Sequence, residues 1–217
     1  MRSTYRLMSL SRNESDDFKE FAMHLPQYFS PEQQIELLQI ARQVAKHSPL
    51  FTPTMKNGAA FRYQNTSCGE QGWISDRLGY RYSKLHPNGK PWYPMPDRIR
   101  DLAMELAALA GEIDYKPQTC LINYYKGNGK LGLHQDNSES NLEPCLISIS
   151  LGDTATFLLG GCKQSDPIKE IELKSGDCLI LASEQRLAFH GIKQVIPGTS
   201  NLLKNGGRLN LTIRQIF

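Results

Sequence analysis

The chain has 217 residues, of which 40% are hydrophobic and 22% are charged, and its net charge is +3. This length predicts one domain with a real core, and so small a charge does not by itself indicate a nucleic-acid partner, although clustered Lys and Arg would permit one. No apolar run approaches the roughly 20 residues of a membrane span, and residues 1–13 lack an apolar stretch of signal-peptide length, so we expect no membrane association.

The five cysteines are odd in number and form no Cys-x-x-Cys pair. Four of the five lie in runs that predict strands or strand edges. Buried free thiols in a reducing compartment explain this pattern better than a disulfide framework does. We therefore expect an intracellular protein, cytoplasmic or, in a eukaryote, nuclear, and we expect a monomer.

Residues 1–49 predict an N-terminal arm followed by a helix. The arm, residues 1–16, is polar and shows little periodicity. Ser30 is a favourable N-cap and Pro31 suits the first helical position, after which apolar residues recur at helical spacing to about His47. One apolar face of this helix should pack against the main body.

Residues 50–94 interleave aromatic side chains with Gly, Pro, Asn, Lys and Arg. Composition alone favours an irregular cap whose aromatics fill a small subsidiary core. The functional alternative is a lid over a site, with aromatics that stack on a planar ligand and basic residues that bind its charge. The aromatic residues are Phe51, Phe61, Tyr63, Trp73, Tyr80, Tyr82, Trp92 and Tyr93.

Residues 95–112 predict a second helix, which starts after Pro96. Apolar residues recur from Ile99 to Leu109 at the spacing of one helical face, and the pattern stops near Gly111. The pattern predicts no catalytic or binding role for this segment, and we interpret it as a scaffold helix.

From residue 118 onward the hydrophobic period changes to two. Eight short runs rich in Ile, Leu and Thr are separated by turns that contain Gly, and no helix lies between them, which excludes parallel βαβ units. We therefore expect residues 118–217 to form a jelly roll, or double-stranded β-helix, with the N-terminal helices as a buttress. The expected strands are 118–125, 131–136, 144–151, 154–160, 168–173, 177–182, 187–195 and 208–216.

A potential metal site begins at His134 and Asp136, which are two residues apart and share one face of an extended backbone. His190 is the other histidine of the β-region, and 53 residues separate it from Asp136. In a jelly roll this separation corresponds to about four strands, which can bring the two segments face to face. Two histidines and one carboxylate are the ligand set of non-haem Fe(II) oxygenases. A His-x-Asp pair alone is more often a turn or a salt bridge, so the prediction depends on its surroundings.

The last expected strand supplies those surroundings, because Arg208, Asn210, Thr212 and Arg214 alternate with apolar residues. A solvent-facing polar side would be the ordinary explanation of this pattern. However, Asn123 and the following Tyr125 alternate in the same way on the run that leads to His134. Inward arginines suit a buried dicarboxylate such as 2-oxoglutarate, because a guanidinium stays charged and binds carboxylates through two parallel hydrogen bonds.

Residues 120–136, 186–192 and 208–215 resemble the AlkB family of Fe(II)/2-oxoglutarate-dependent nucleic-acid dealkylases. The runs Asn-x-Tyr-x8-His-x-Asp and Arg-x-Asn-x3-Arg match the pattern of that family. The similarity extends back through residues 68–73 and 79–83, and it covers about residues 60–217. It implies one Fe(II)/2-oxoglutarate dioxygenase domain over residues 1–217, and it favours a nucleotide-recognition lid over a structural cap.

The resemblance also implies a role for each matched residue. The expected ligands of Fe(II) are His134, Asp136 and His190. The expected 2-oxoglutarate contacts are Arg208 with Tyr125 and Asn210 at the distal carboxylate, and Arg214 with Asn123 at the end that chelates iron. Among the expected nucleic-acid contacts, Trp73 stacks on one side of the base, with His134 on the other side, and Tyr80 also touches the nucleic acid. Charge and loop position add four expected phosphate contacts, which are Arg81, Lys126, Lys130 and Lys163.

The implied reaction removes an N-methyl group from a base of the 1-methyladenine or 3-methylcytosine type as formaldehyde, while 2-oxoglutarate and O2 become succinate and CO2. The substrate would be DNA or RNA, single-stranded or with the base flipped out, and the process would be repair of alkylation damage. One position departs from the family: Ser138 stands where the best-studied pattern has a second aspartate. Either base choice has shifted, or the neighbouring Glu139 reads the base.

Two other functions stay open at this point. One is an oxygenase of the same chemistry that acts on a protein or a small molecule, against which Trp73 and the aromatic segment argue. The other is a non-catalytic nucleic-acid-binding jelly roll, against which the intact ligand set and both arginines argue.

Overall fold

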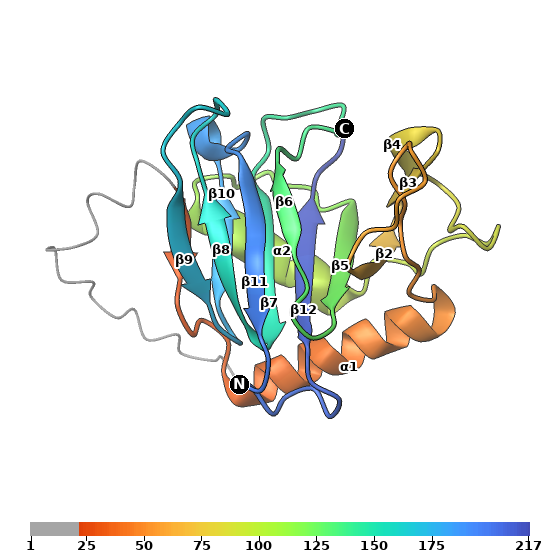
Figure 1. Ribbon diagram of the computed structural model, residues 1–217, viewed down its shortest axis with the longest axis horizontal. Coiled ribbons are helices and arrows are strands. Elements are labelled where there is room, and N and C mark those ends of the chain that lie inside the picture. Colours follow the sequence, from red (N-terminus) through yellow and green to blue (C-terminus); the bar gives the residue numbers. More distant parts are fainter. Residues whose placement is uncertain (1–21) are drawn as a thin grey trace, which may run out of the picture.

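The computed structural model describes residues 22–217, so the expected arm of residues 1–16 lies outside the described residues. Figure 1 shows helices packed against one side of a β-structure. The helices are α1 (Pro31–His47) and α2 (Asp97–Leu109), and a short 3-10 helix covers Ser183–Gln185. The strands are β1 (Met23–Leu25), β2 (Gln64–Gly69), β3 (Gly72–Asp76), β4 (Gly79–Ser83), β5 (Thr119–Tyr125), β6 (Leu131–His134), β7 (Leu146–Gly152), β8 (Thr154–Leu159), β9 (Lys169–Leu173), β10 (Cys178–Leu181), β11 (His190–Ile196) and β12 (Arg208–Arg214).

Helix α1 begins where the sequence predicts. Ser30 Oγ accepts a hydrogen bond from the backbone N–H of Gln33, and the Gln33 side chain accepts one from the backbone N–H of Ser30. This reciprocal cap satisfies two N–H groups that have no partner within the helix. Pro31 occupies the first turn, and the helix ends at His47 as expected.

The jelly roll predicted for residues 118–217 is confirmed. A six-stranded sheet has the order β1-β10-β7-β12-β5-β2, and a four-stranded sheet has the order β6-β11-β8-β9. The eight strands β5 to β12 pass back and forth between these two sheets, and the strand pairs within the two sheets are antiparallel. Each of the eight expected strands exists, although the run 131–136 ends at His134 and the run 187–195 begins only at His190.

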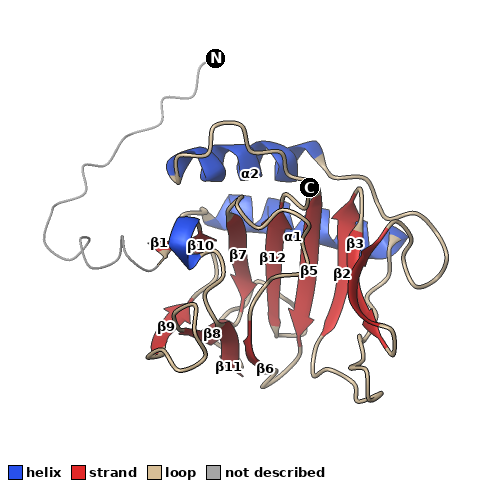
Figure 2. Cartoon of the chain, turned by 90° about the horizontal axis from the view of Figure 1, so that it is seen from above, coloured by secondary structure: helices blue, strands red, loops and turns tan. Residues whose placement is uncertain are grey.

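Both helices lie on the outer face of the six-stranded sheet, as Figure 2 shows. Leu37 and Leu38 of α1, together with Leu102 and Leu106 of α2, belong to the same buried cluster as the outward residues of β5, β7 and β12. A second buried cluster lies between the two sheets. The outer core therefore fixes the large sheet, and the inner face of that sheet remains available to line a site.

The structure divides the segment of residues 50–94, which the sequence treats as one lid. Strand β2 pairs with β5 and extends the six-stranded sheet, whereas β3 and β4 form a separate hairpin. Strand β2 escapes a pattern search because its buried residues include Asn65, Thr66 and Ser67, which are polar. The part of this segment that is separate from the main sheets is thus the hairpin and its flanking loops.

Two further expectations concern thiols and membranes. All five cysteines are free thiols, and four of them are buried, as predicted. Among residues 22–217, no helix has both the length and the apolar character that crossing a membrane would require.

Candidate metal and cosubstrate site

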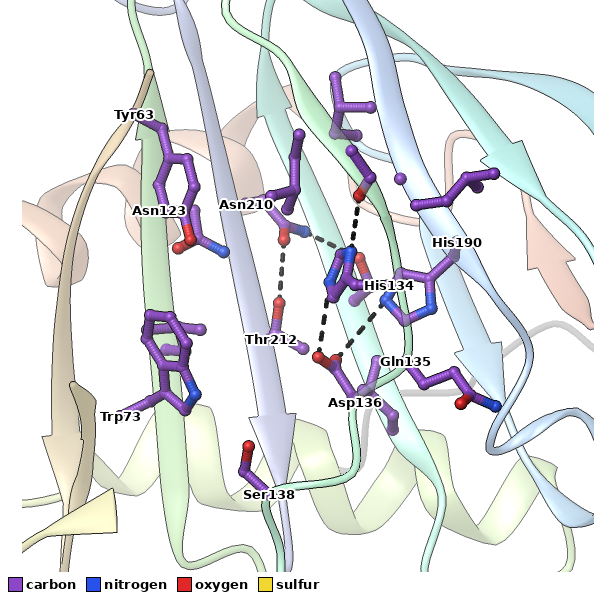
Figure 3. Close-up of a pocket in the computed structure, with 18 of the residues that line it drawn as sticks. Tyr63, Trp73, Asn123, His134, Gln135, Asp136, Ser138, His190, Asn210 and Thr212 are labelled. Atoms are coloured by element: carbon purple, nitrogen blue, oxygen red, sulfur yellow. Dashed lines mark hydrogen bonds and ion pairs between the residues drawn. The ribbon is translucent and has the colours of Figure 1, made fainter. Parts of the chain in front are cut away.

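Three potential metal ligands lie at the end of β6 and the start of β11. His134 is the last residue of β6, His190 is the first of β11, and the two are register partners. Asp136 follows in the loop after β6, so it is the loop that turns its carboxylate toward the histidines. The ligand atoms of the three residues lie within 4.8 Å of one another, and Figure 3 shows the side chains converging. Strand pairing therefore brings together residues that are distant in sequence.

Backbone carbonyls orient both imidazoles. Nδ1 of His134 lies 2.9 Å from the carbonyl oxygen of Gly132, and Nδ1 of His190 lies 2.9 Å from that of Ala188. A ring that donates Nδ1–H to a carbonyl keeps the lone pair on Nε2, which is the tautomer that binds a metal. Both Nε2 atoms lie 3.6 Å from a carboxylate oxygen of Asp136, so the three donors face one point.

The protonation states of the triad suit a metal. Burial would raise the pKa of Asp136, but Arg214, whose Nη2 donates a 2.6 Å hydrogen bond to Asp136 Oδ2, holds this pKa well below its usual value with help from His190 and His134. Burial, assisted by the neighbouring His190, lowers the pKa of His134. At neutral pH the carboxyl is therefore ionised and the His134 imidazole is neutral, as metal binding requires.

Strand β12 turns its polar residues inward, as the alternating sequence predicts. Its register places Arg208 beside Tyr125 and Asn210 beside Asn123 on β5. The residues expected to hold 2-oxoglutarate therefore share the inner face of the large sheet. The residues of β12 that line the cavity are Arg208, Asn210, Thr212 and Arg214, and those in the core under the helices are Leu209, Leu211 and Ile213.

Arg208 is a buried cation with hydrogen-bonding capacity to spare. Its exposed fraction is 1%, and burial lowers its pKa to about 10, which still leaves it charged at neutral pH. Nη2 donates to Ser150 Oγ at 2.9 Å, whereas Nε and Nη1 have no partner. The guanidinium lies over the Tyr125 ring, 5.7 Å from its centroid. Among the described residues no carboxylate lies within ion-pair distance of Arg208, so a bound carboxylate would satisfy a cation that is otherwise costly to bury.

The two asparagines on this face differ in how many of their side-chain atoms already have a hydrogen-bond partner. Asn210 donates Nδ2 to Ser148 Oγ at 2.7 Å and accepts from Thr212 Oγ1 at 2.9 Å. Asn123 is also buried, but its Oδ1 has no partner. Asn210 therefore stiffens the wall beside Arg208, and Asn123 retains an acceptor for a ligand.

A cavity of about 460 Å³ contains the triad and the polar face of β12. Its size lies within the roughly 300–1,000 Å³ of ordinary ligand sites. Tyr63 also lines the cavity, and its ring centroid lies 5.3 Å from that of Tyr125. The sequence pattern predicts no role for Tyr63, because it does not distinguish this residue from the other aromatics of residues 50–94.

The hairpin β3–β4 supplies the opposite wall of this cavity. Trp73 and Tyr80 stack with ring centroids 5.7 Å apart and an interplanar angle of 26°. Trp73 is half-buried, whereas Tyr80 is 57% exposed. In Figure 3, Trp73 and His134 lie on opposite sides of the cavity, and Ser138 lies at one end between them. The structure thus places Trp73 and His134 on facing walls of one cavity.

Glu139 does not present a free carboxylate for reading a base. It is buried, it accepts a 2.7 Å hydrogen bond from Tyr82, and its oxygens lie 3.4 Å from Arg186 Nη2 and 3.1 Å from Arg214 Nε. Glu139 also lines the cavity, but these three side chains already engage its carboxylate, whereas Ser138 is half-buried at the cavity wall. Neither Arg186 nor Tyr82 was assigned a role from the sequence, since each looks locally like an ordinary loop or strand residue.

The basic residues expected to contact phosphate differ in availability. Arg81 donates two hydrogen bonds to Asp76, at 2.8 and 2.7 Å, so its charge is already paired. Lys126 and Lys130 are exposed in the loop between β5 and β6, and Lys163 is exposed in the loop between β8 and β9. The four residues therefore come from three segments of the chain, and the charge of one of them is already paired.

The donor set fits Fe(II) with 2-oxoglutarate. Two imidazoles and one carboxylate hold one side of a six-coordinate metal and leave the opposite positions open. Within the same cavity, Arg208 offers two unpaired N–H donors and Asn123 offers an unpaired acceptor. A dicarboxylate that chelates the metal at one end would meet Arg208 with its other end.

Comparison with known proteins gives the same result. Residues 21–214 match the family model of the 2OG-Fe(II) oxygenase superfamily. The α-ketoglutarate-dependent dioxygenase AlkB homolog of Caulobacter vibrioides is 41% identical over 172 residues, which are 79% of this chain and 76% of that protein. AlkB of Escherichia coli K12 is 39% identical over 181 residues, 83% of each chain. The solved structure of OsALKBH1 superposes with a TM-score of 0.76 at 28% identity and covers 89% of this chain and 97% of that one. The chain therefore belongs to the AlkB family of the 2OG-Fe(II) oxygenase superfamily and is an Fe(II)- and 2-oxoglutarate-dependent dioxygenase.

Proposed function

We propose that this dioxygenase removes N-methyl groups from the Watson–Crick edge of nucleobases in DNA, of the 1-methyladenine and 3-methylcytosine type, and so repairs alkylation damage. The observation that carries the proposal is Trp73 facing His134 across the cavity, because a flat base between them would place its edge beside the metal ligands. Fe(II) with bound 2-oxoglutarate supplies the O2-dependent oxidation of a C–H bond, which releases the methyl group as formaldehyde.

The inner face of the large sheet positions the cosubstrate. Arg208 pairs with the distal carboxylate, and the buried Tyr125 beside it contributes a phenol whose pKa is raised to about 12 by burial. Such a phenol remains protonated and can donate a hydrogen bond at any physiological pH. Asn123 and Arg214 lie toward the chelating end, where Arg214 also holds Asp136. The chain thus orients both the cosubstrate and the carboxylate that shares its metal.

The hairpin selects a planar and cationic substrate. Methylation at adenine N1 or cytosine N3 makes the base positive, and the face of Trp73 then adds a cation–π interaction of about 1–2 kcal/mol. Such a base pairs weakly, so flipping it out of a duplex costs less than the few kcal/mol that a normal base requires. Ser138 would accept one hydrogen bond from the exocyclic amine without adding a charge.

The nucleic-acid strand would leave the site along a second hollow beside the hairpin. Met55, Tyr80 and Ser138 line both this hollow and the main cavity, and Lys56 and Asn57 line its outer part. An exposed aromatic next to a lysine suits a flanking base and its phosphate. We include Lys126, Lys130 and Lys163 as possible contacts of the more distant backbone.

We also propose that the enzyme works as a monomer in the cytoplasm. The four buried free thiols suit a reducing compartment. Light scattering of the purified protein during size-exclusion chromatography tests the monomer, with a dimer mass as the contrary result.

Mass spectrometry of oligonucleotides tests the function. The protein is loaded anaerobically with Fe(II) and 2-oxoglutarate and then exposed to O2 with DNA or RNA strands that carry different N-methyl bases. Loss of the methyl group from a 1-methyladenine or 3-methylcytosine strand is the expected result. Turnover of methylated peptides alone would favour a protein oxygenase, and tight binding of nucleic acid without formaldehyde would favour a binding module.

A further inference from the structure

An ionic cluster joins Asp136 and Arg214 to two further residues, Glu139 and Arg186, to which the proposed function gives no direct contact with the metal, the cosubstrate or the base. Its centre is Glu139, whose side chain is 1% exposed and lies between Arg186 and Arg214. Both arginines are buried, and Arg214 is also paired with Asp136. Two cations and two carboxylates thus balance within a buried space. Removal of one partner from such a cluster leaves an uncompensated charge.

Arg186 fastens the loop that carries Asp136. It follows the 3-10 helix Ser183–Gln185 and lies four positions before His190, the first residue of β11. Its Nη1 donates to the backbone carbonyl of Asp136 at 2.8 Å, and its Nε donates to that of Pro144 at 2.8 Å. These contacts hold both ends of the loop between β6 and β7, and Glu139 pairs with the same guanidinium from the middle of the loop.

Glu139 also reaches the hairpin. Tyr82, on β4, donates its O–H to Glu139 Oε1 at 2.7 Å. Tyr82 is the register partner of Trp73 on β3, so the residue that donates this hydrogen bond lies on the strand next to the one that carries the indole. One buried carboxylate is therefore linked to three parts of the site. Arg186 links it to the metal-ligand loop, Arg214 links it to the cosubstrate strand, and Tyr82 links it to the base hairpin.

We propose that Glu139 is a positioning residue that couples the hairpin carrying Trp73 to the loop carrying Asp136. Its contacts keep Asp136 aligned only while the hairpin packs against the loop. Oxidation therefore depends on an occupied base site. Glu139 touches neither the metal nor the base, and it acts through Arg186, Arg214 and Tyr82. This inference rests on the proposed function, in which the hairpin binds a nucleobase.

The first test cuts the hairpin contact with Tyr82→Phe, which removes one hydroxyl and keeps the ring. Succinate and formaldehyde are measured together on a 1-methyladenine strand, with ascorbate as the reductant for turnovers that do not oxidise the substrate. The ratio of succinate to formaldehyde should rise at least about twofold, because second contacts of metal ligands commonly affect activity by 10–100-fold. A merely structural loss would lower both products equally, and an unchanged ratio overturns the coupling.

Tyr28→Phe is the matched control. Tyr28 donates its hydroxyl to Glu105 at 3.0 Å in an exposed tyrosine–carboxylate hydrogen bond between the N-terminal segment and α2, away from the cavity. This variant should keep the parent ratio of succinate to formaldehyde. A shift equal to that of Tyr82→Phe would show that the ratio responds to any lost tyrosine hydrogen bond, and would overturn the inference.

A second test does not depend on any nucleic acid. Glu139→Gln keeps the side-chain shape but removes its charge, which leaves Arg214 to pair with Asp136 alone in competition with the metal. The Kd for Fe(II), measured anaerobically with 2-oxoglutarate present, should increase about tenfold. A Kd within twofold of the parent value, in a folded variant, contradicts the positioning role. Should the parent demethylate no nucleic acid at all, the proposed function fails while this binding test still decides the role of Glu139.

Discussion

The jelly-roll core and the β3–β4 hairpin form opposite walls of one cavity, but they are built differently. On the core side, the inward polar groups are oriented by specific partners: Asp136 by Arg214, and each ligand histidine by a backbone carbonyl. On the hairpin side, Tyr80 is largely exposed and Trp73 is half-buried, and the described contact between them is stacking.

This difference separates chemistry from substrate choice. Buried donors with fixed partners keep one geometry, which metal and cosubstrate binding require. An aromatic wall with few polar contacts accepts several planar ligands, because every base has a face that can stack. We therefore expect changes in the core to remove activity and changes in the hairpin to redirect or weaken it.

The largest effect should come from Asp136→Asn. The amide keeps the side-chain shape but removes the charge that binds the metal and pairs with Arg214. Fe(II) binding and formaldehyde release should both fall below detection, as measured by anaerobic titration and by a formaldehyde assay. Retained turnover would refute the ligand assignment.

Arg208→Lys should be the next most damaging change. Lysine keeps a positive charge but cannot offer the two unpaired N–H groups of the guanidinium. Losing a charged hydrogen bond costs roughly 1.5–3 kcal/mol, so the Kd for 2-oxoglutarate should increase about 10–100-fold by anaerobic titration. Arg98→Lys, which alters an exposed ion pair with Glu36, is the control and should bind 2-oxoglutarate like the parent.

Trp73→Ala tests the hairpin side of the comparison. Base stacking contributes about 1–3 kcal/mol, so kcat/KM for a methylated strand should decrease about 10–100-fold while the Kd for 2-oxoglutarate stays unchanged. Ile113→Ala, at a highly exposed position away from the cavity, provides a neutral reference. An equal loss of cosubstrate affinity in the Trp73 variant would erase the distinction between the two walls.

Ser138→Asp should have a smaller effect, which changes the preference among methylated bases. A carboxylate opposite a cationic base adds attraction that serine lacks, so the ratio of kcat/KM for cationic over neutral methylated bases should rise several-fold. Competition between two oligonucleotides in one reaction measures that ratio. A change in Fe(II) affinity as large as the change in preference would show that position 138 belongs to the metal site instead.

The smallest effect is a pH dependence of stability in the metal-free protein. Since the pKa of His134 is lowered by burial and by His190, the folded state binds a proton less readily than the unfolded state. Stability should therefore be complete above the usual histidine value of about 6.5 and decrease as the pH falls below it. The Tm, compared at about pH 7.5 and about pH 5.5, should drop less in His134→Asn than in the parent, and an equal drop in both would exclude His134 as the cause.

The core was the more predictable of the two regions. Alternation in residues 208–214 is a strong local signal, because a strand with one buried face repeats every two residues. The His-x-Asp pair is weak alone and gains its meaning from this strand. Strand β2 was hidden because Asn65 and Ser67 are polar but buried, which breaks the usual pattern.

Contacts that depend on tertiary packing left no such signal. Arg186 occurs singly in a polar run, and only the fold brings its guanidinium to the backbone of Asp136 and to Glu139. For the same reason Glu139 looked like a candidate for reading the base, although both its oxygens lie beside arginines. Sequence spacing identifies which residues share a strand face, but not which loops meet behind it.

The most direct test of the central claim is the product stoichiometry on a single-stranded DNA that carries one 1-methyladenine. Succinate and formaldehyde should appear in equal amounts, and both should require Fe(II), 2-oxoglutarate and an intact His134, Asp136 and His190. Succinate without formaldehyde from every methylated DNA and RNA strand would contradict the proposal that the wall formed by Trp73 holds a nucleobase against the metal site.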